Sequence, residues 1–581
     1  MATPLDFEVY GSNPAALFDL KIFRGEGMAL LGMNWKSGPP PSNFVGFAIE
    51  YQEPNGTQFY ALTNKVYFPG TDINANPNLR STRLNPIQKF RWIHFPYHPG
   101  LKGSYTYRVT PVFMNAQQVL SYGDHQQADI QLENETYPGA INIAFTRGFV
   151  TSQAFEDRFA DGNKEHRLLP TKKADDHLTF VSENPQAAKA YDWMGLEARQ
   201  VILNLLDAAI ADETAKVVVT AYDLDEKEVV DRLLMLKSKL RIIIDNSDKH
   251  GLPGSYETTA AKQLEDAGAE VQRQKVGSLQ HNKYIAVRGK VQQAIGGSTN
   301  FSWRGFFVQN NNAILVHGEQ QIDLFFTAFQ NLWDNKGADG HHDDMGMFET
   351  TVSAEWNNLN FPGVDAAVTF SPHGDSNAKL AEIAGLVGAA TSSVMYSLAF
   401  LFQTPGPILE NIKKVTNDNS IFVYGISDKN VEGLDLQMPD GNATIAFPKP
   451  LEKGAVEGFE DEESIGSGIR MHHKFIVIDF DKPTAQTFVG SYNFSHPADM
   501  QNGENLWRFR DRKIAVSYMI EAVALFDHYE WRDALSKANA KHVKLELKLP
   551  PAVPGGKTWW AEDYTVPMKI RDRELFSQQS K

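Results

Sequence analysis

The sequence predicts an α/β protein in which two similar halves follow an all-β domain. Three observations carry this prediction. Short alternating segments fill roughly the first 135 residues, strand-like and helix-like segments alternate from about residue 170 onward, and four short motifs occur twice in the same order. The chain has 581 residues, which is far more than one hydrophobic core requires, so three or more structural units are expected.

Residues 1–135 are expected to form a β-sandwich. Alternating segments such as "FVGFAIEYQ" and "SYTYRVTPVF" lie between turn clusters rich in proline, glycine and asparagine. The segment "LKGSYTYRV" resembles the sixth strand of fibronectin type III and related immunoglobulin-like domains, where a leucine precedes the corner tyrosine by six residues, as Leu101 precedes Tyr107. Trp35 would then be a core residue of an early strand. Domains of this kind usually bind or pack, and they rarely catalyse.

Residues 136–170 are expected to be a linker, after which the pattern changes. "AKVVVTAYDL" (215–224) is strand-like, "DEKEVVDRLLMLKSK" (225–239) has helical apolar spacing, and "LRIIIDN" (240–246) is strand-like again. This alternation is typical of βαβ units and predicts a parallel or mixed sheet.

An internal duplication defines the two halves. Separations between matched positions stay nearly constant: 190 residues from Phe180 to Phe370, 191 from His281 to His472, and 193 from Ser298 to Ser491. The matched segments are "HLTFVSENP" with "AVTFSPHGD", "RIIID" with "IFVYG", "SLQHNKYIAV" with "GIRMHHKFIVID", and "AIGGSTNFS" with "TFVGSYNFS". We therefore predict one half at 171–350, a second at 351–540, and a C-terminal arm at 541–581.

The arm contains several prolines and the pair Trp559 and Trp560. We expect it to be extended and to pack these aromatic rings onto the body of the protein; a platform for an aromatic ligand is the alternative.

The duplicated motif places polar chemistry on apolar strands. Alternate residues of a strand share a face, so His281 and Lys283 point the same way, as do His472 and Lys474. His473 would point to the opposite side. A Gly-Ser-x-Asn segment follows in each half and supplies Ser298, Asn300, Ser491 and Asn493. If the halves pack about a pseudo-twofold axis, the two sets meet in one cleft.

Such a cleft suits an anionic tetrahedral phosphorus. Lysine and asparagine can hold phosphate oxygens, one histidine can attack phosphorus, and the other can protonate the leaving oxygen and later deprotonate water. No metal is required. A purely structural histidine and lysine would be the simpler reading of either copy alone, but two copies in register favour function.

The second half resembles the phospholipase D superfamily, whose signature is HxKxxxxD followed by GSxN. It matches at every position, with His472, Lys474, Asp479, Ser491 and Asn493, and the later Asn-x-Glu is matched by Asn502 and Glu504. The first half matches at His281, Lys283, Ser298 and Asn300. It departs at Arg288, where the aspartate is expected, and at Gln309–Asn312, where an acid is expected.

The resemblance covers roughly residues 170–540 and implies two α-β-α sandwich halves that form a pseudo-dimer. It implies a phosphodiesterase without metal or cofactor that works through a phosphohistidine. Its catalytic residues would be His281 as nucleophile, His472 as general acid and then base, Lys283, Lys474, and Glu504, which would orient a histidine across the cleft. Substrate phosphate would be bound by Ser298, Asn300, Ser491 and Asn493, with Asp479 and Asn502 as supports. The departures at Arg288 and Gln309–Asn312 leave two interpretations open, an asymmetric active site or weakened activity.

The family includes phospholipases, phospholipid synthases and nucleases. Fusion of both halves in one chain and a net charge of −15 favour a phospholipid head group over nucleic acid. The segments "GSYNFS" and "NGEN" are similar to the nuclease branch, so a nuclease acting on DNA or RNA is the alternative. A phosphate-binding scaffold with weakened activity is a third interpretation. The same intermediate would serve hydrolysis or transfer to an alcohol.

Several classes are excluded or disfavoured. The chain has no cysteine, which excludes disulfides, thiolate catalysis and Cys-based zinc sites. Its start does not read as a signal peptide and it has no long apolar run, so we expect a cytoplasmic monomer, with signal-independent export and peripheral membrane contact left open. The β domain would dock a membrane or a protein partner. "HHDD" (His341–Asp344) reads as a loop rather than a metal site, and the acidic Glu457–Ser464 as a solvated loop or a lid.

Overall fold

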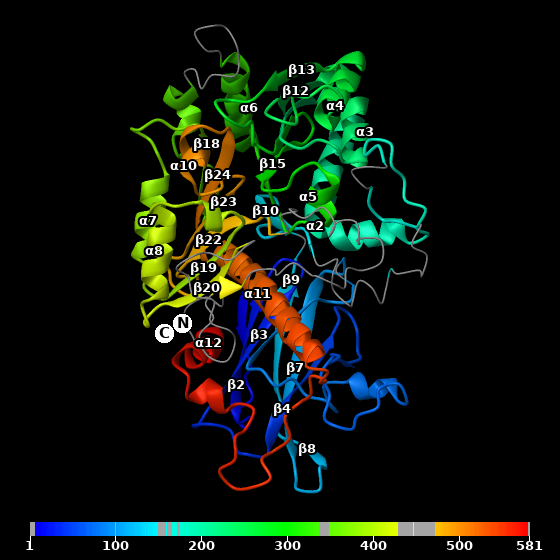
Figure 1. Ribbon diagram of the computed structural model, residues 1–581, viewed down its shortest axis with the longest axis vertical. Helices are drawn as coiled ribbons and strands as arrows, with labels where there is room; N and C mark the ends of the chain where they lie inside the picture. Colours follow the sequence, from blue (N-terminus) through cyan, green and yellow to red (C-terminus); the bar gives the residue numbers. More distant parts are fainter. Residues whose placement is uncertain are drawn as a thin grey trace.

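The computed structural model describes residues 6–98, 100–133, 135–148, 159, 166–170, 175–335, 348–427, 445–446 and 471–578. The interpretations of His341–Asp344 and Glu457–Ser464 lie outside the described residues. Figure 1 shows an elongated molecule with the all-β region at one end and two α/β regions side by side at the other. The predicted α/β class with a preceding all-β region is confirmed.

The all-β region is built from two antiparallel sheets that share one core. The first sheet runs β1 (Glu8–Tyr10), β2 (Phe18–Arg24), β3 (Ala29–Trp35), β6 (Arg91–His94). The second runs β5 (Tyr60–Ala61), β4 (Phe44–Gln52), β7 (Gly103–Met114), β8 (Leu120–Tyr122), with β9 (Gln126–Leu132) also pairing with β7. Apolar side chains of both sheets meet in a single buried cluster, which is the expected result of strands that alternate in and out.

Two sequence predictions can be compared with this core. Trp35 is buried and packs against Phe44 and Phe113, so the prediction that it is a core residue is confirmed. The corner tyrosine was assigned wrongly. The hydroxyl of Tyr105 donates to the Leu101 carbonyl at 2.9 Å, whereas the Tyr107 hydroxyl lies 2.8 Å from His94 Nδ1. Both tyrosines point into the core, so spacing alone could not distinguish them.

The first half is a mixed seven-stranded sheet covered on both faces. Its order is β10 (Ile141–Phe145), β16 (Asn312–His317), β15 (Gln292–Gly297), β14 (Tyr284–Arg288), β11 (Lys216–Ala221), β12 (Leu240–Asp245), β13 (Glu270–Gln274). One face packs against α2 (Ala187–Ala211), α3 (Lys227–Leu236), α4 (Tyr256–Asp266) and the short α5 (Trp303–Phe307). The other packs against α6 (Glu319–Asp334). These layers make an α-β-α sandwich.

The second half repeats this order and adds one edge strand. Its sheet runs β17 (Asn357–Asn358), β18 (Asp365–Ser371), β24 (Glu504–Arg510), β23 (Gln486–Gly490), β22 (Lys474–Ile478), β19 (Ser393–Leu398), β20 (Phe422–Ile426), β21 (Ile445–Ala446). One face packs against α7 (Leu380–Gly388), α8 (Pro407–Thr416) and the short α10 (His496–Met500), and the other against the long α11 (Arg512–Ala540). The predicted duplication is confirmed at the level of sheet topology.

One predicted match within the duplication is wrong. Phe370 on β18 is opposite Asn505, and the residue opposite the equivalent Asn312 is Phe145 on β10. The true counterpart of β18 is therefore β10, which lies inside the predicted linker 136–170. The segment at 177–185 forms turns and no strand. A buried strand of five residues has no helical or alternating period of its own, so its membership in the sheet was not visible in the sequence.

Long C-terminal elements join the three regions. Helix α11 runs from the second half onto the β-sandwich (Figure 1), where its Asp527 pairs with Arg91 at 2.5 Å. The arm then returns along the sandwich, and the Trp559 indole donates to the Phe44 carbonyl at 3.0 Å. The predicted packing of the arm is confirmed, although the arm ends in a helix, α12 (Pro567–Ser577), rather than being extended throughout.

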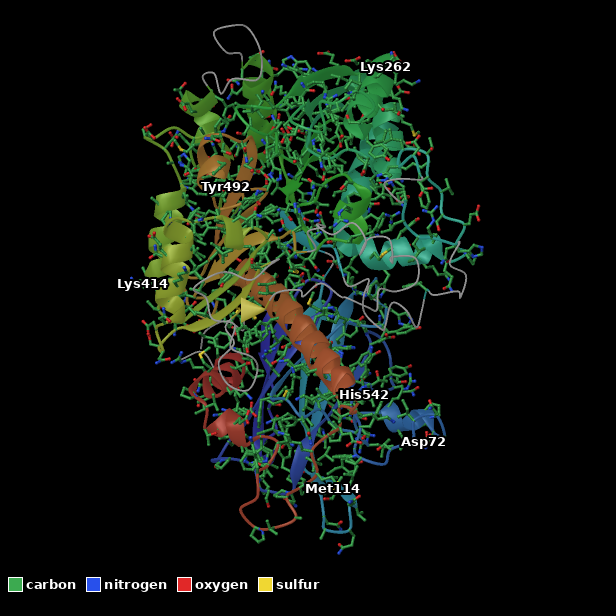
Figure 2. All side chains as sticks on the ribbon, in the orientation of Figure 1. Asp72, Met114, Lys262, Lys414, Tyr492 and His542 are labelled. Carbon is green, nitrogen blue, oxygen red and sulfur yellow. The ribbon has the colours of Figure 1, made fainter. Side chains whose placement is uncertain are left out.

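That last helix lies close to a sheet. A Cβ placed on Gly32 of β3 would lie 2.0 Å from the carbonyl oxygen of Phe576 in α12, so only glycine permits this approach. Figure 2 shows Lys262 of α4 and Lys414 of α8 on the outer edges of the two halves, with Tyr492 inward of both. In the part of the chain that the structure describes, no helix combines the length and apolarity needed to cross a membrane.

Candidate active site

Each motif histidine is held by the opposite half of the molecule. His281 Nδ1 lies 2.8 Å from the carboxylate oxygen Oε2 of Glu504. His472 Nδ1 lies 2.8 Å from the amide oxygen Oδ1 of Asn311. Since each Nδ1 faces an acceptor, its proton is donated there and the Nε2 atom of each ring is left for a ligand. The two halves therefore form one shared site, as predicted from the duplication.

The backbone just before each motif histidine also pairs with the opposite half. Gln280, just before the first motif histidine, forms a parallel bridge with Gly503, and Met471, just before the second, forms one with Asn310. The amide of Gly503 donates to the Leu279 carbonyl at 2.9 Å. These reciprocal contacts are the signature of a pseudo-twofold axis.

Both serines of the Gly-Ser-x-Asn segments support the residues behind the histidines. The Ser491 hydroxyl donates to Glu504 Oε2 at 2.6 Å, and the Ser298 hydroxyl donates to Asn311 Oδ1 at 3.0 Å. Each serine oxygen also accepts the backbone amide of the residue after its partner, Asn505 or Asn312. The geometry explains why serine is needed there, and a direct phosphate-binding role for either serine stays a prediction.

The two lysines are buried beside the histidines. Lys474 Nζ donates to the carbonyl of His472 at 2.6 Å, and Lys283 Nζ donates in the same way to the carbonyl of His281. Neither lysine has a carboxylate within ion-pair distance in the described part of the chain. Because a buried ammonium without a counter-ion is costly, the arrangement favours an anionic ligand.

The asparagines of the site differ in their surroundings. Asn300 Nδ2 donates to Asp223 Oδ2 at 2.6 Å, while its Oδ1 is buried with no protein partner. Asn493 Oδ1 is likewise buried and without a protein partner. The predicted support Asn502 donates to Glu504 Oε1 at 3.2 Å. Unsatisfied buried polar atoms at a shared cleft are typical of a site for a polar ligand.

Electrostatics set the two histidines apart. Burial lowers the pKa of His281, and the Glu504 carboxylate opposes that shift. Burial and then the neighbouring Lys474 both lower the pKa of His472, which falls well below its usual range. Burial also lowers the pKa of Lys283, to about 7, and that of Lys474 well below its usual range. A bound phosphodiester anion would stabilise the protonated form of every one of these groups.

The motif aspartate is a structural residue in the second half. Asp479 accepts the backbone amides of Thr391, Ser392 and Ser393, at 2.7–3.0 Å, and so fixes the turn that leads into β19. Its supporting role in catalysis stays a prediction. Arg288 stands at the equivalent position of the first half and pairs instead with Asp323 on the surface.

In the first half a different aspartate, Asp212, makes hydrogen bonds of this kind to the backbone of a turn. Asp212 accepts the amide of Lys290 at 2.6 Å and the amide of Thr214 at 2.9 Å, and it fixes the turn that leads into β11. These backbone hydrogen bonds, led by the one from Lys290, lower the pKa of Asp212 to about 2. The sequence analysis did not predict that Asp212 would take the place of the motif aspartate. The pattern that could have indicated it is an Asp two residues before a Thr, just ahead of a strand.

The walls of the site, meaning the two residues that follow β11 in the first half and β19 in the second, also differ between the halves. The register of the paired strands makes Tyr222 equivalent to Ala399 and Asp223 equivalent to Phe400. The Tyr222 ring lies 4.7 Å from the His281 ring and beneath Lys283, whereas Phe400 lies 5.9 Å from Lys474 Nζ. One wall is therefore polar and acidic, and the other is apolar.

His473 lies outside this site. Its Nε2 is 3.0 Å from Glu521 on α11, and its ring packs against Phe145 and Phe475. The predicted orientation, away from the cleft, agrees with these contacts.

One family model matches a large part of each half. Residues 204–333 and 385–522 match the family model described as "Cardiolipin synthase, PLD-like domain". The first region contains His281 and Asn311, and the second contains His472 and Glu504. A search of the curated proteins gave no match.

Several solved structures are similar to the chain at low identity. Polyphosphate kinase from Porphyromonas gingivalis matches with 8% identity and a TM-score of 0.38, over 66% of this chain and 54% of the kinase. Phosphatidylserine synthase from Haemophilus influenzae matches with 14% identity and a TM-score of 0.39, over 56% and 83% of the two chains. The phospholipase D family member Nuc from Salmonella typhimurium matches with 21% identity and a TM-score of 0.20, over 24% of this chain and 87% of Nuc.

Proposed function

We propose that the protein is a metal-independent phosphodiesterase of the phospholipase D superfamily that cleaves or transfers a phospholipid head group, since both halves match a PLD-like family model. The observation that carries the proposal is the crossed pair of histidines, each held at Nδ1 by the opposite half, with two buried lysines beside them. Such a site offers a nucleophile, an acid and a cationic cradle without any further component.

The chemistry follows from the two Nε2 atoms, which the hydrogen bonds at Nδ1 leave for a ligand. His281 Nε2 attacks phosphorus, and the bond from phosphorus to the leaving oxygen breaks as His472 Nε2 gives that oxygen its proton. His472 then takes a proton from water, or from an acceptor alcohol, whose oxygen attacks phosphorus and releases His281. The ammonium groups of Lys283 and Lys474 and the amides of Asn300 and Asn493 would hold the non-bridging oxygens.

The unequal backing groups support this division of roles. A nitrogen bonded to phosphorus leaves the His281 ring positively charged, and the Glu504 carboxylate at 2.8 Å stabilises that charge. The acid must instead alternate between two protonation states. The neutral amide of Asn311 orients His472 without fixing it as a cation, so the ring can give and take its proton.

The unequal walls support a phospholipid substrate. A phospholipid has a polar alcohol on one ester oxygen of phosphorus and an apolar diacylglycerol on the other. Asp223 and Tyr222 line the wall beside His281, and Phe400 lines the wall beside Lys474. The net charge of −15 disfavours a polyanionic substrate. Peripheral contact with a membrane would then bring the cleft to its substrate, and the β-sandwich is available for that contact or for a protein partner.

A substrate panel tests the proposal. The full-length protein is incubated in EDTA with vesicles of mixed phospholipids and, separately, with single-stranded DNA, double-stranded DNA and RNA. We expect release of a head group that is lost in His281→Ala and in His472→Ala. Cleavage of nucleic acid alone would replace the lipid assignment with a nuclease. No turnover on any substrate, with phosphate analogues still bound, would indicate a binding scaffold.

A further inference from the structure

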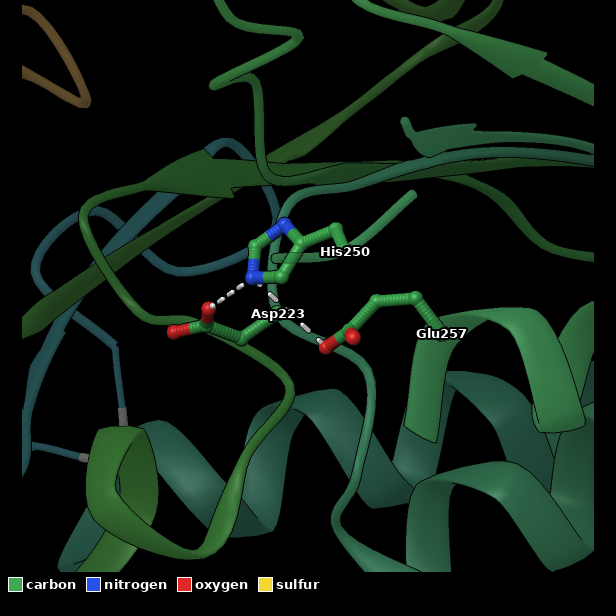
Figure 3. A group of neighbouring side chains, drawn as sticks. All are labelled: Asp223, His250 and Glu257. Carbon is green, nitrogen blue, oxygen red and sulfur yellow. Dashed lines mark ion pairs between the residues drawn. The ribbon is translucent and has the colours of Figure 1, made fainter. Parts of the chain in front are cut away.

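A second polar cluster lies behind the wall of the first half. His250 presents Nε2 between two carboxylates, 3.2 Å from Asp223 Oδ1 and 3.8 Å from Glu257 Oε1 (Figure 3). One donor atom from each of the three residues falls within 4.8 Å of the others. The three side chains come from the end of β11, the loop after β12 and the first turn of α4. Only Asp223 also belongs to the proposed active site, as part of the wall beside His281; the proposed reaction gives His250 and Glu257 no role.

The opposite side of the histidine ring is fixed by a fourth residue. His250 Nδ1 lies 2.8 Å from Asp245 Oδ2, and Asp245 is fully buried. The same carboxylate oxygen accepts the amide of Ser247 at 3.0 Å and its hydroxyl at 2.5 Å. Asp245 therefore cannot rotate freely, and it directs the ring so that Nε2 faces Asp223 and Glu257. A carboxylate behind a histidine whose other nitrogen faces further ligands is a characteristic support of metal-binding histidines.

We propose that Asp223, His250 and Glu257 bind a divalent transition-metal ion, such as Mn²⁺ or Zn²⁺. One imidazole nitrogen with two carboxylate oxygens is a donor set for these ions, whereas Ca²⁺ and Mg²⁺ prefer oxygen ligands alone. Ligands bonded at about 2.0–2.2 Å stand roughly 3.0–3.5 Å apart in octahedral or tetrahedral geometry. The nitrogen-to-oxygen separations of 3.2 and 3.8 Å need little adjustment to reach that range. The side chain of Asp223 is 32% exposed, which leaves room for water to complete the coordination.

Other histidine–carboxylate pairs in the described chain lack this arrangement. His177 pairs with Asp225 at 2.7 Å, and its Nε2 has no protein partner. His373 pairs with Asp499 at 2.7 Å, and its Nε2 lies 2.9 Å from the hydroxyl of Thr369. In neither pair does a second carboxylate face the free nitrogen. The convergence on His250 is therefore a local feature and not a general habit of buried histidines in this fold.

The site would be coupled to the catalytic centre without entering the chemistry. Asp223 accepts the amide group of Asn300 through its other oxygen, Oδ2, at 2.6 Å. Asp245 accepts the backbone amide of Gln280, the residue before His281, at 2.7 Å. A bound ion would further stabilise the supports of Asn300 and of the start of the motif strand, and turnover in EDTA is expected to continue without it. The ion need not touch the substrate.

Direct binding tests the inference. The full-length protein is freed of metal by dialysis against a chelator, which is then removed, and titrated with Mn²⁺ followed by electron paramagnetic resonance and with Zn²⁺ followed by calorimetry. We expect one ion per chain.

Matched variants separate this site from adventitious binding. Glu257→Gln preserves the shape of the side chain and removes one charged ligand, and we expect it to weaken binding on the order of 100-fold. His177→Asn changes the carboxylate-paired histidine that lacks a second acid and should leave binding unchanged. Circular dichroism checks that both variants are folded. Absence of binding up to millimolar metal, or equal affinity in wild type and in folded Glu257→Gln, would overturn the proposal.

Discussion

The two histidines of the cleft occupy equivalent positions, but their supporting groups differ. His281 faces a carboxylate from the second half, and His472 faces an amide from the first half, both at 2.8 Å. An equivalent serine hydroxyl donates to each supporting group, from Ser491 to Glu504 and from Ser298 to Asn311. The hydrogen bond at Nδ1 is thus equally long in both halves, whereas only His281 has a negatively charged partner. This difference fits an enzyme in which one histidine is always the nucleophile and the other alternates between acid and base.

A second comparison separates fold from function. Both acids expected in the first half are missing from their motif positions. The structural acid has a substitute on the opposite turn, because Asp212 links the turn before β11 to the turn after β14, and Asp479 links the two equivalent turns of the second half. The functional one has been replaced by Asn311, which retains the hydrogen bond and loses the charge. The departures of the first half are therefore compatible with an intact site.

The largest expected effect is the loss of the proposed nucleophile. In His281→Ala the phosphohistidine cannot form, so kcat/KM for head-group release should fall by roughly four orders of magnitude or more. The initial rate on phospholipid vesicles measures this. A folded His281→Ala protein with wild-type turnover would show that His281 is neither nucleophile nor acid and would contradict the proposed mechanism.

His472→Ala should act through the leaving group. With a phospholipid, whose leaving alcohol needs a proton, we expect a fall of roughly 10²–10⁴-fold. With a nitrophenyl phosphodiester, whose leaving group is stable without a proton, we expect a much smaller fall in the first, burst phase. Comparing the two substrates in one preparation checks this; an equal loss on both would argue against an acid role.

Exchanging the supporting groups should move the pH optimum in opposite directions. The optimum of kcat/KM lies midway between the pKa values of the two histidines, whichever is higher. Asn311→Asp adds a negative charge beside His472, raises its pKa and moves the optimum upward by about half a pH unit or more. Glu504→Gln removes the charge beside His281, lowers its pKa and moves the optimum downward.

Activity should respond to the same pair of variants. Glu504→Gln should also lower the maximal rate by roughly 10–100-fold, because the charged intermediate loses its counter-ion. Rate profiles between pH 4 and pH 9 for both variants and the wild type provide the measurement. Shifts of equal sign in the two variants would show that the supporting groups do not control the two histidines separately.

The smallest effects concern stability rather than activity. Asp479→Ala removes the acceptor of three backbone amides and should cost about 1–3 kcal/mol of unfolding free energy. Asp212→Ala should also lower the thermal midpoint. Arg288→Ala removes a surface ion pair with Asp323 and a contact with the Phe326 ring, and should change stability by less than about 1 kcal/mol. Thermal unfolding of the three variants tests this order, and an Arg288→Ala protein less stable than Asp479→Ala would contradict it.

The sequence was most informative where a physical pattern repeats. The motif strands and their histidines follow from alternation along strands and from duplication, whereas the pairing with Glu504 across the cleft was expected from the family resemblance. The strand β10 could not be found, because five buried residues carry no period and its partner β16 lies far away in the chain. Asn311 and Asp212 could not be assigned roles, because their hydrogen bonds depend on how the two halves and a distant turn meet in space.

The central claim is that His281 carries the phosphoryl group. The most direct measurement is to mix the His472→Ala protein with an excess of a nitrophenyl phosphodiester, quench with alkali, in which phosphohistidine survives, and map the labelled peptide by mass spectrometry. His472→Ala is chosen because it should form the intermediate and hydrolyse it slowly. We predict one adduct per chain on His281. An adduct on any other residue, or none in a protein that still releases nitrophenol, would contradict the claim.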